Sequence, residues 1–316
     1  MPSEPPPGTP GTTAAAGTPG PTAATAPVGP VPVTLVHACL RDGTGGSPTA
    51  VVLETGAPLG EEARRGVAVA SGTSHAVFVR VREEDGPEPT VDLRFFTAEG
   101  ELPACGHGTV AALVLLASRA APDGPYRATL RTARSAFPGR ARAEGGRGTG
   151  LFDPGPVDLR PPTAAERGLV LPALGLAPDE VGPEPRVAGV GRERILVPVS
   201  SRAALAALAP DPGRLRAACD RLGLLGAYVH SPPSAAGALA ARMFAPSIGV
   251  PEDVANANGT ACLAAHLAGR GFTDLAVDMG DALGSPARIT ATVVDGPGDA
   301  GRLGPRILIG GTARVA

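Results

Sequence analysis

Short apolar runs separated by Gly- and Pro-rich turns dominate the chain from about Pro32 onward. In the first half, β-branched and aromatic residues in these runs predict strands, and Glu61–Ala70 has a helical pattern. The predicted strands cover 33–40, 50–54, 76–81 and 91–96. The next run, Thr109–Ser118, is apolar on all sides, which is typical of a helix buried in a core.

The second half repeats this order of elements. It predicts helices over 203–208 and 213–222, strands over 226–230 and 239–244, and then a second apolar helix over Thr260–Leu267. Pro- and Gly-rich loops are expected over 152–162 and 181–191, and the chain should finish in strands over 287–294 and 306–315.

A short block of sequence occurs in both halves and starts each apolar helix. Glu101 to Thr109 can be placed over Glu252 to Thr260, with Glu, Ala, Gly and Thr at matching positions. An Arg-x-Phe strand precedes each block. We therefore predict an α+β fold of two pseudo-symmetric halves, 32–150 and 151–316, whose last strands pack back on the first half. Residues 1–31, rich in Pro, Gly, Thr and Ala, are expected to be a disordered leader.

Composition excludes several classes of function. The formal net charge is −2 and there is no Trp, so no basic or stacking surface for nucleic acid is predicted. All 28 basic residues are Arg, which excludes a Schiff-base lysine and a Walker lysine. The four cysteines lack metal-site spacing, so no metal is expected. There is neither a signal-peptide pattern nor an apolar run long enough to span a membrane, and we expect a cytoplasmic protein.

The starts of the two apolar helices are candidate sites for a small carboxylate ligand. The first turn of a helix has free backbone N–H groups and a partial positive charge. The expected ligand-binding residues are Gly106, Gly108, Thr109, Gly259 and Thr260. Alternatively, the glycines only permit tight turns into core helices.

Four ionisable residues are candidates for proton transfer. His107, just before the first apolar helix, would tend to stay neutral and relay protons, and Asp253 precedes the second. Cys105 could act as a base if its thiol is activated, or could be a small buried hydrophobic residue. His75, at the turn entering a strand, is either functional or an exposed loop residue.

These residues also resemble those of a known family. The segments RMFAPSIGVPED (242–253) and LRFFTAEGELPACGHGT (93–109) are similar to segments of the PhzF-like isomerases and epimerases of phenazine biosynthesis. The resemblance extends over nearly the whole chain from Val33. It implies the diaminopimelate epimerase-like fold, in which each half is a barrel-like sheet around a central helix.

The resemblance also implies site residues, with departures. The family isomerases use a Glu as the main acid/base, and His75 stands in its place here. His107 and Asp253 match the family's supporting His and Asp, whereas Thr260 replaces the usual Ser. The resemblance implies an isomerase that shifts a proton and double bond on an amino-acid-derived or cyclic carboxylate, without a cofactor. Secondary-metabolite (antibiotic) biosynthesis and a homodimer are implied as well.

Two alternative functions remain open at the level of the sequence. The segment Ala104–Thr109 is similar to the first cysteine motif of proline racemases, and Asn258 occupies the position of their second cysteine. A one-base racemase or dehydratase using Cys105 is therefore an alternative. The missing Glu makes a non-catalytic metabolite-binding protein the other alternative.

Overall fold

The computed structural model describes residues 31–82, 88–120, 124–294 and 304–316. The predicted leader therefore lies outside the described residues, except for Val31. Within the described parts of the chain, no helix is long and apolar enough to cross a membrane.

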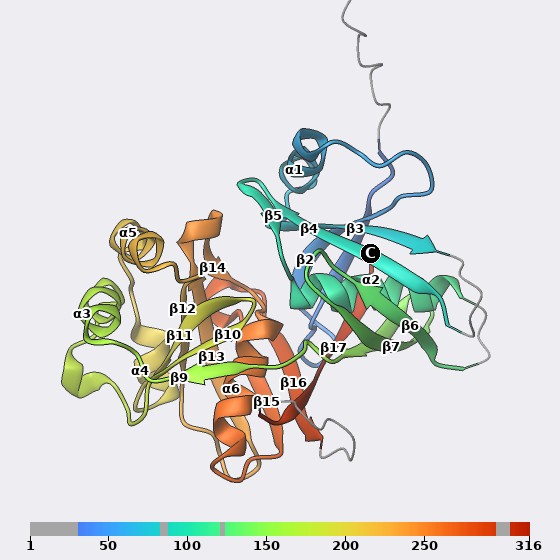
Figure 1. Ribbon diagram of the computed structural model, residues 1–316. Coiled ribbons are helices and arrows are strands. Elements are labelled where there is room, and N and C mark those ends of the chain that lie inside the picture. The colour runs from blue at the N-terminus through green and yellow to red at the C-terminus, as the bar shows by residue number, and fades with distance from the viewer. Residues whose placement is uncertain (1–30, 83–87, 121–123, 295–303) are drawn as a thin grey trace, which may run out of the picture. The chain divides into compact units, whose positions relative to one another are not determined.

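In the first half, strands form a closed ring (Figure 1). Around the ring, each strand pairs with the next in the order β1, β2, β3, β4, β6, β7, β8 and β17, and β17 closes the ring by pairing with β1. The strands are β1 (Thr34–Ala38), β2 (Ser47–Leu53), β3 (His75–Arg82), β4 (Thr90–Thr97), β6 (Tyr126–Arg131), β7 (Ala136–Glu144), β8 (Arg147–Phe152) and β17 (Arg306–Val315). Only β2–β3 and β4–β6 pair in parallel within this ring.

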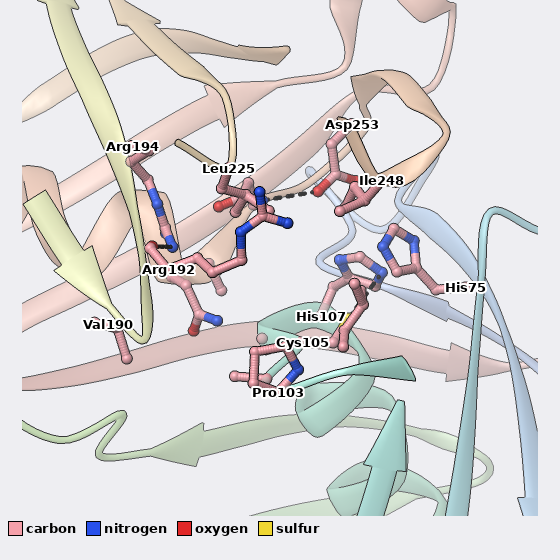
Figure 2. A pocket seen from close by; sticks show the side chains of 16 residues that line it. His75, Pro103, Cys105, His107, Val190, Arg192, Arg194, Leu225, Ile248 and Asp253 are labelled. Atoms are coloured by element: carbon pink, nitrogen blue, oxygen red, sulfur yellow. Dashed lines mark hydrogen bonds between the residues drawn. The ribbon is translucent and has the colours of Figure 1, made fainter. Parts of the chain in front are cut away.

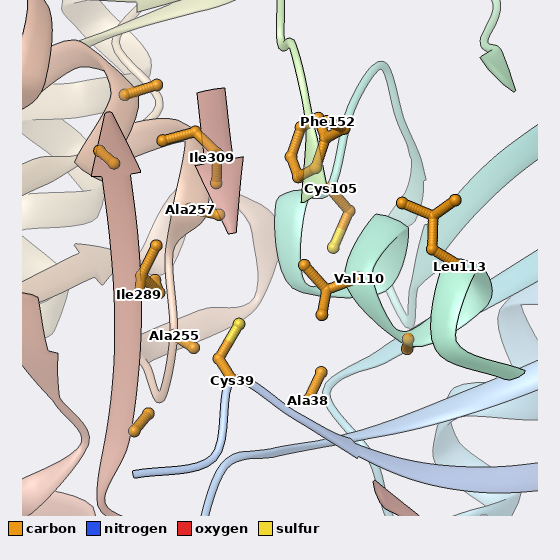
Figure 3. Packing of buried hydrophobic residues seen from close by; sticks show 14 of the residues in the cluster. Ala38, Cys39, Cys105, Val110, Leu113, Phe152, Ala255, Ala257, Ile289 and Ile309 are labelled. Atoms are coloured by element: carbon orange, nitrogen blue, oxygen red, sulfur yellow. The ribbon is translucent and has the colours of Figure 1, made fainter. Parts of the chain in front are cut away.

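The ring encloses the first apolar helix, α2 (Gly106–Arg119), which contacts β1, β2, β3, β6, β7, β8 and β17. Its first eleven residues are all buried, as the pattern predicted. Val110 and Leu113 lie among Ala38, Phe152 and Cys39 in the main core (Figure 3). A helix that is apolar on every side is stable here because the strands surround it.

The second half follows the same plan around α6 (Ala257–Ala268). Its strands pair in the order β9, β10, β11, β12, β13, β15, β16 and β17, with β11–β12 and β13–β15 parallel. The strands are β9 (Asp158–Arg160), β10 (Arg186–Val190), β11 (Arg192–Pro198), β12 (Ala227–His230), β13 (Ala238–Ala245), β15 (Asp274–Met279) and β16 (Ala287–Val294). Both parallel pairs thus recur at matching places, which confirms the predicted α+β fold of two pseudo-symmetric halves.

Smaller elements complete the two halves. Strands β5 (Gly100–Leu102) and β14 (Val250–Asp253) lead towards α2 and α6. The remaining helices are α1 (Glu61–Ala70), α3 (Ala164–Ala173), α4 (Arg202–Ala207), α5 (Pro212–Leu222) and the 3₁₀ turns η1 (Pro178–Glu180), η2 (Pro246–Ile248) and η3 (Asp281–Leu283). Helices α3 and α5 pack together, and both contribute to a second hydrophobic cluster.

The predicted loops were partly wrong. β10 lies inside the expected loop 181–191, and its backbone pairs with both β9 and β11. β9 likewise lies inside the expected loop 152–162. Sheet pairing on two sides stabilises β10 despite a Gly in its sequence, because context outweighs strand propensity. β8 runs across position 150, and the domain division proposed there stays a prediction.

Candidate functional site

The site lies where helices α2 and α6 begin next to each other. A Cβ added at Gly106 would fall 2.4 Å from the Cβ of Ala257, so this close approach needs a glycine. Each start is preceded by the same ion pair: Arg94 with Glu101 in the first half, and Arg242 with Glu252 in the second. The repeated sequence block therefore places the two helix ends in equivalent positions.

A cavity at these helix ends contains most of the predicted catalytic residues (Figure 2). His75, Cys105, Gly106, His107 and Asp253 all line it, together with residues from β10, β11 and the loops nearby. Neither Gly108 nor Gly259 nor Thr260 lines this cavity. Thr109 lines a second cavity that adjoins the first.

Several backbone N–H groups at the two helix starts already have acceptors within the protein. The N–H of Thr109 donates to the Cys105 carbonyl, and that of Thr260 to the Asn256 carbonyl. The N–H of Gly259 donates to the side chain of Asn256, which caps α6. These three groups are thus occupied within the protein, and of the predicted binding residues only Gly106 is both in the cavity and at a free helix end. Gly259 is needed instead for packing, since a Cβ there would meet the Tyr228 ring.

His107 is held between two partners. Its Nδ1 donates to the carbonyl oxygen of Ala255 at 2.7 Å, and its Nε2 lies 3.4 Å from Sγ of Cys105. Burial lowers the pKa of His107, but the electrostatic effects of nearby Cys105 and Asp253 and the two hydrogen bonds outweigh it and raise the pKa to about 10. His107 is therefore cationic at neutral pH, contrary to the sequence-based expectation of a neutral ring.

His75 has the opposite charge state. It is 3% exposed, so the alternative of an exposed loop residue is wrong. Its Nδ1 lies 2.9 Å from Oγ of Ser74, and its ring meets the ring of His107 edge to face with centroids 4.5 Å apart. Burial, and secondarily the charge on His107, lower the pKa of His75 well below its usual value, so this imidazole stays neutral.

Asp253 faces the same cavity and is also buried. Its carboxylate accepts hydrogen bonds from the N–H of Ala255 and from Nδ2 of Asn256. These bonds fix the loop whose Ala255 carbonyl orients His107. Asp253 thus acts on His107 in two ways. The charge of Asp253 raises the pKa of His107, and the hydrogen bonds of Asp253 position the Ala255 carbonyl that accepts from His107.

The cavity itself is small, about 40 Å³, whereas the adjoining one measures about 240 Å³. Cys105 and Asn258 line both, but His75, His107 and Asp253 line only the smaller. A cavity of about 150 Å³ is needed to hold a benzene-sized ligand. A ring-sized substrate must therefore enlarge the smaller cavity or extend into the larger one beside Cys105.

Three of these side chains have the chemistry of a metal site. The nearest ligand atoms of His75, Cys105 and His107 all lie within 4.8 Å of one another. Two imidazoles and a thiolate suit a thiophilic ion such as Zn²⁺. Because both Nδ1 atoms are hydrogen-bonded, each ring would bind the ion through Nε2, which in His107 means giving up the contact with Sγ of Cys105.

One residue of the cavity was missed in the sequence. Arg194 of β11 is 1% exposed and lines the cavity together with Arg192. In the sequence, Gly-Arg-Glu-Arg before an apolar strand is typical of a solvated turn. The alternation of side chains along β11 could have indicated that Arg194 shares a face with Leu196 of the core.

Comparisons with known proteins agree with this architecture. The PhzC-PhzF family, described as phenazine biosynthesis-like protein, matches residues 36–316. The chain belongs to this family. Curated relatives of the family are named isomerases, as the sequence predicted.

Two such relatives illustrate the similarity. The uncharacterized isomerase YddE of Escherichia coli (strain K12) is 30% identical over 183 residues, which is 54% of this chain and 58% of that protein. Trans-2,3-dihydro-3-hydroxyanthranilate isomerase of Pseudomonas aeruginosa is 31% identical over 225 residues, covering 71% of this chain and 74% of that protein.

Solved structures show the same fold. A phenazine biosynthesis protein of the PhzF family from Bacillus anthracis aligns with a TM-score of 0.74 at 20% identity, covering 90% of this chain and 97% of that one. A probable proline racemase from Agrobacterium radiobacter K84 aligns with a TM-score of 0.62 at 14% identity, covering 90% of each chain. At such identities the likeness concerns the fold alone.

Proposed function

We propose that this protein is a cofactor-independent isomerase that shifts a proton and a double bond on a small amino-acid-derived or cyclic carboxylate. The observation that carries the proposal is the pair of histidines packed edge to face in one cavity, where their surroundings shift their pKa values in opposite directions. Neutral His75 can accept a proton, and cationic His107 beside it can stabilise negative charge.

The proposed proton shift has two steps, in which His75 first takes a proton and then returns it. The ring nitrogen of His75 that faces away from Ser74 takes a proton from a substrate carbon, and the C–H electron pair forms the new double bond as the old one delocalises. The resulting imidazolium then returns the proton to the far carbon of the allylic system. Because burial and the charge on His107 disfavour the cationic form of His75, the equilibrium favours return of the proton to the substrate.

Deuterium uptake tests this reaction class. Purified protein would be incubated in deuterated water with a panel of cyclic and α-amino carboxylates that includes trans-2,3-dihydro-3-hydroxyanthranilate, the compound named for the Pseudomonas relative. Proton NMR should show a migrated double bond and deuterium at the carbon that gains the proton. Ligand binding without any exchange across the panel would contradict the isomerase and favour a metabolite-binding protein.

A second candidate function uses Cys105 as the only base, as in a racemase or dehydratase. It is favoured by the contact between Cys105 and cationic His107, and by the position of Cys105 on the wall of the larger cavity. Asn258 lines the same cavity and, by the resemblance, stands where a two-thiol racemase would need its second cysteine. Alkylation of Cys105 by iodoacetamide, with loss of activity and protection by substrate, would support this candidate over the first.

The finer parts of the proposal follow the resemblance. They are a role in secondary-metabolite biosynthesis, a location in the cytoplasm and assembly as a homodimer. Each stays a prediction that these observations do not test.

A further inference from the structure

The two most deeply buried arginines of the described chain differ in their partners. Arg64 and Arg194 are each 1% exposed. Arg64 donates Nε and Nη2 to the carboxylate of Glu54, and its guanidinium lies over Phe78. Arg194 forms no ion pair with any described carboxylate. Its Nη2 donates to the backbone carbonyl of Arg192, while Nε and Nη1 are buried without an acceptor.

The pattern of β11 explains why Arg194 is inside. Successive residues of a strand point to opposite faces. Glu193 lies on one face and binds Arg160. Arg194 is on the other face with Leu196, which belongs to the core around α6. Arg194 thus lines the cavity together with Ala257 and Asn258 at the start of α6. Figure 2 shows Arg192, Arg194 and Asp253 around this cavity.

A buried cation without a counter-ion is unfavourable unless an anion joins it. Of the acidic residues, Asp253 faces this cavity, but its oxygens accept hydrogen bonds from Ala255 and Asn256. Arg194 and the start of helix α6 both contribute positive potential to the same space. The cavity is therefore arranged to attract an anionic group from outside the protein.

We propose that Arg194 binds the carboxylate of the substrate through its unpartnered guanidinium nitrogens. This inference rests on the proposed function and deepens it. The main anion-binding group is then the Arg194 side chain on β11 rather than the glycines at the helix starts. Arg194 lies outside the repeated sequence block. His75 lines the same cavity, so a small substrate whose carboxylate binds Arg194 would share this cavity with the proposed base.

Binding of matched probes tests the role of Arg194 without requiring turnover. The probes are acetate, benzoate and anthranilate, and the neutral control is anthranilamide. Calorimetry should show that Arg194→Met weakens carboxylate binding about 10- to 100-fold, the usual loss for a charged hydrogen bond. Arg194→Lys should recover part of the affinity, and anthranilamide should bind both proteins alike. Arg186→Met is the matched control, because Arg186 lies on the neighbouring strand β10, outside the lining of this cavity, and pairs with Glu184.

Thermal unfolding distinguishes binding from a structural role. Without ligand, Arg194→Met should melt at the same temperature as wild type or higher, because an unpaired buried charge has been removed. A lower melting temperature with unchanged carboxylate affinity would overturn the proposal, as would a wild-type protein that binds none of the three carboxylates. Arg194-dependent binding in a protein that shows no deuterium exchange would refute the isomerase while leaving this inference standing.

Discussion

His75 and His107 are adjacent, and the pKa values of the two imidazoles are shifted in opposite directions. The difference follows from their neighbours. His107 contacts Cys105 and lies near Asp253, both of which favour its cationic form, whereas the His75 ring lies against the neutral hydroxyl of Ser74 and the ring of His107. Environments that separate two titrating groups in this way are typical of acid/base sites.

The dependence of kcat/KM on pH should follow these shifts. His75 must be neutral and His107 cationic, so the rate should be flat near neutral pH and fall as pH rises through about 10, when His107 loses its proton. On the acid side the rate should fall only well below pH 6.5, because the pKa of His75 is lowered. His107→Asn should abolish the alkaline limb. A limb near pH 6.5 that vanishes in His75→Gln would contradict the assignment.

The same pKa shifts predict a pH dependence of stability. The raised pKa of His107 favours folding below the unfolded-state pKa of about 6.5, and this contribution should be lost as pH rises through about 10. The lowered pKa of His75 has the reverse sign, so its protonation should destabilise the protein as pH falls below about 6.5. Urea unfolding of wild type and His75→Gln across pH would show a smaller acid-side loss in the variant. An equal loss in both proteins would exclude His75 as the cause.

Zinc should inhibit the enzyme by occupying its base. A Zn²⁺ ion bound to Cys105 and the two histidines would take the lone pair that His75 needs. Activity should fall on addition of Zn²⁺ and return with a chelator, and Cys105→Ser should be less sensitive. Cobalt substitution would report a thiolate-to-metal charge-transfer band; a band that persists in Cys105→Ser would exclude this ligand set.

At the residue scale the sequence predicts much of the site but not its electrostatics. His75, Cys105, His107 and Asp253 could be named from motifs, and the structure brings them into one cavity. The charge of His107 could not be predicted, because it depends on how deeply the ring is buried and on how close Cys105 and, from the other half, Asp253 lie to it. Arg194 was missed because its burial depends on which face of β11 meets the main core.

At the scale of elements, the two halves repeat the same ion pair in different surroundings. The side chains of Arg94 and Glu101 are 37% and 27% exposed, whereas those of Arg242 and Glu252 are 12% and 11% exposed. Arg242 also donates to the carbonyls of Leu205 and Leu208, which ties β13 to α4. The second pair is therefore the structurally important one.

Substitutions in the two pairs should differ in cost. Arg242→Met should lower the free energy of unfolding by about 3–5 kcal/mol, as expected when a buried ion pair loses one partner. Arg94→Met should cost about 0–1 kcal/mol because its pair is solvated. Urea titration measures both, and equal costs would show that burial does not distinguish the pairs.

The close approach of α2 and α6 gives a second test at this scale. Gly106→Ala places a Cβ 2.4 Å from that of Ala257, so the helix starts must separate. We expect a loss of about 1–3 kcal/mol in stability, as for other overpacked sites, together with a lower kcat. Gly66→Ala in α1 is the matched control: nothing lies within 4 Å of the added atom, and the variant should be neutral or slightly more stable. Equal behaviour of both variants would contradict the packing argument.

Element prediction succeeded where the pattern was strong. The range Glu61–Ala70 of α1 was predicted to the residue, and both apolar helices were found. Helix α3 was missed because Gly168 and Pro172 interrupt its pattern, although the capping box of Thr163 and Glu166 is a signal that could have revealed it. β10 was missed because its stability depends on partners on both sides.

At the scale of the whole described chain, β17 links the two sheets. Its first part pairs with β16, its later part with β1, and most of its length with β8. A Cβ at Gly310 would meet Leu151 of β8 and Thr290 of β16, so both sheets pack closely against this strand. Removal of β17 would therefore leave unpaired strand edges in both sheets.

Unfolding should consequently be one cooperative transition for residues 32–316, despite the two pseudo-symmetric halves. Gly310→Val should shift the whole transition to lower denaturant rather than split it. Coincident curves from far-ultraviolet circular dichroism and tyrosine fluorescence, from Tyr126 and Tyr228, would check this. Two separate transitions would show that the halves are independent.

The central claim is that His75 is the acid/base of a proton shift. It is tested most directly by the rate of deuterium incorporation, followed by proton NMR, in wild type, His75→Gln and Cys105→Ser with the same carboxylate substrate. We expect Cys105→Ser to retain exchange, whereas the rate of exchange should fall about 100-fold or more in His75→Gln, the usual contribution of a general acid/base. Exchange that survives in His75→Gln and is lost in Cys105→Ser would contradict the account and identify Cys105 as the base.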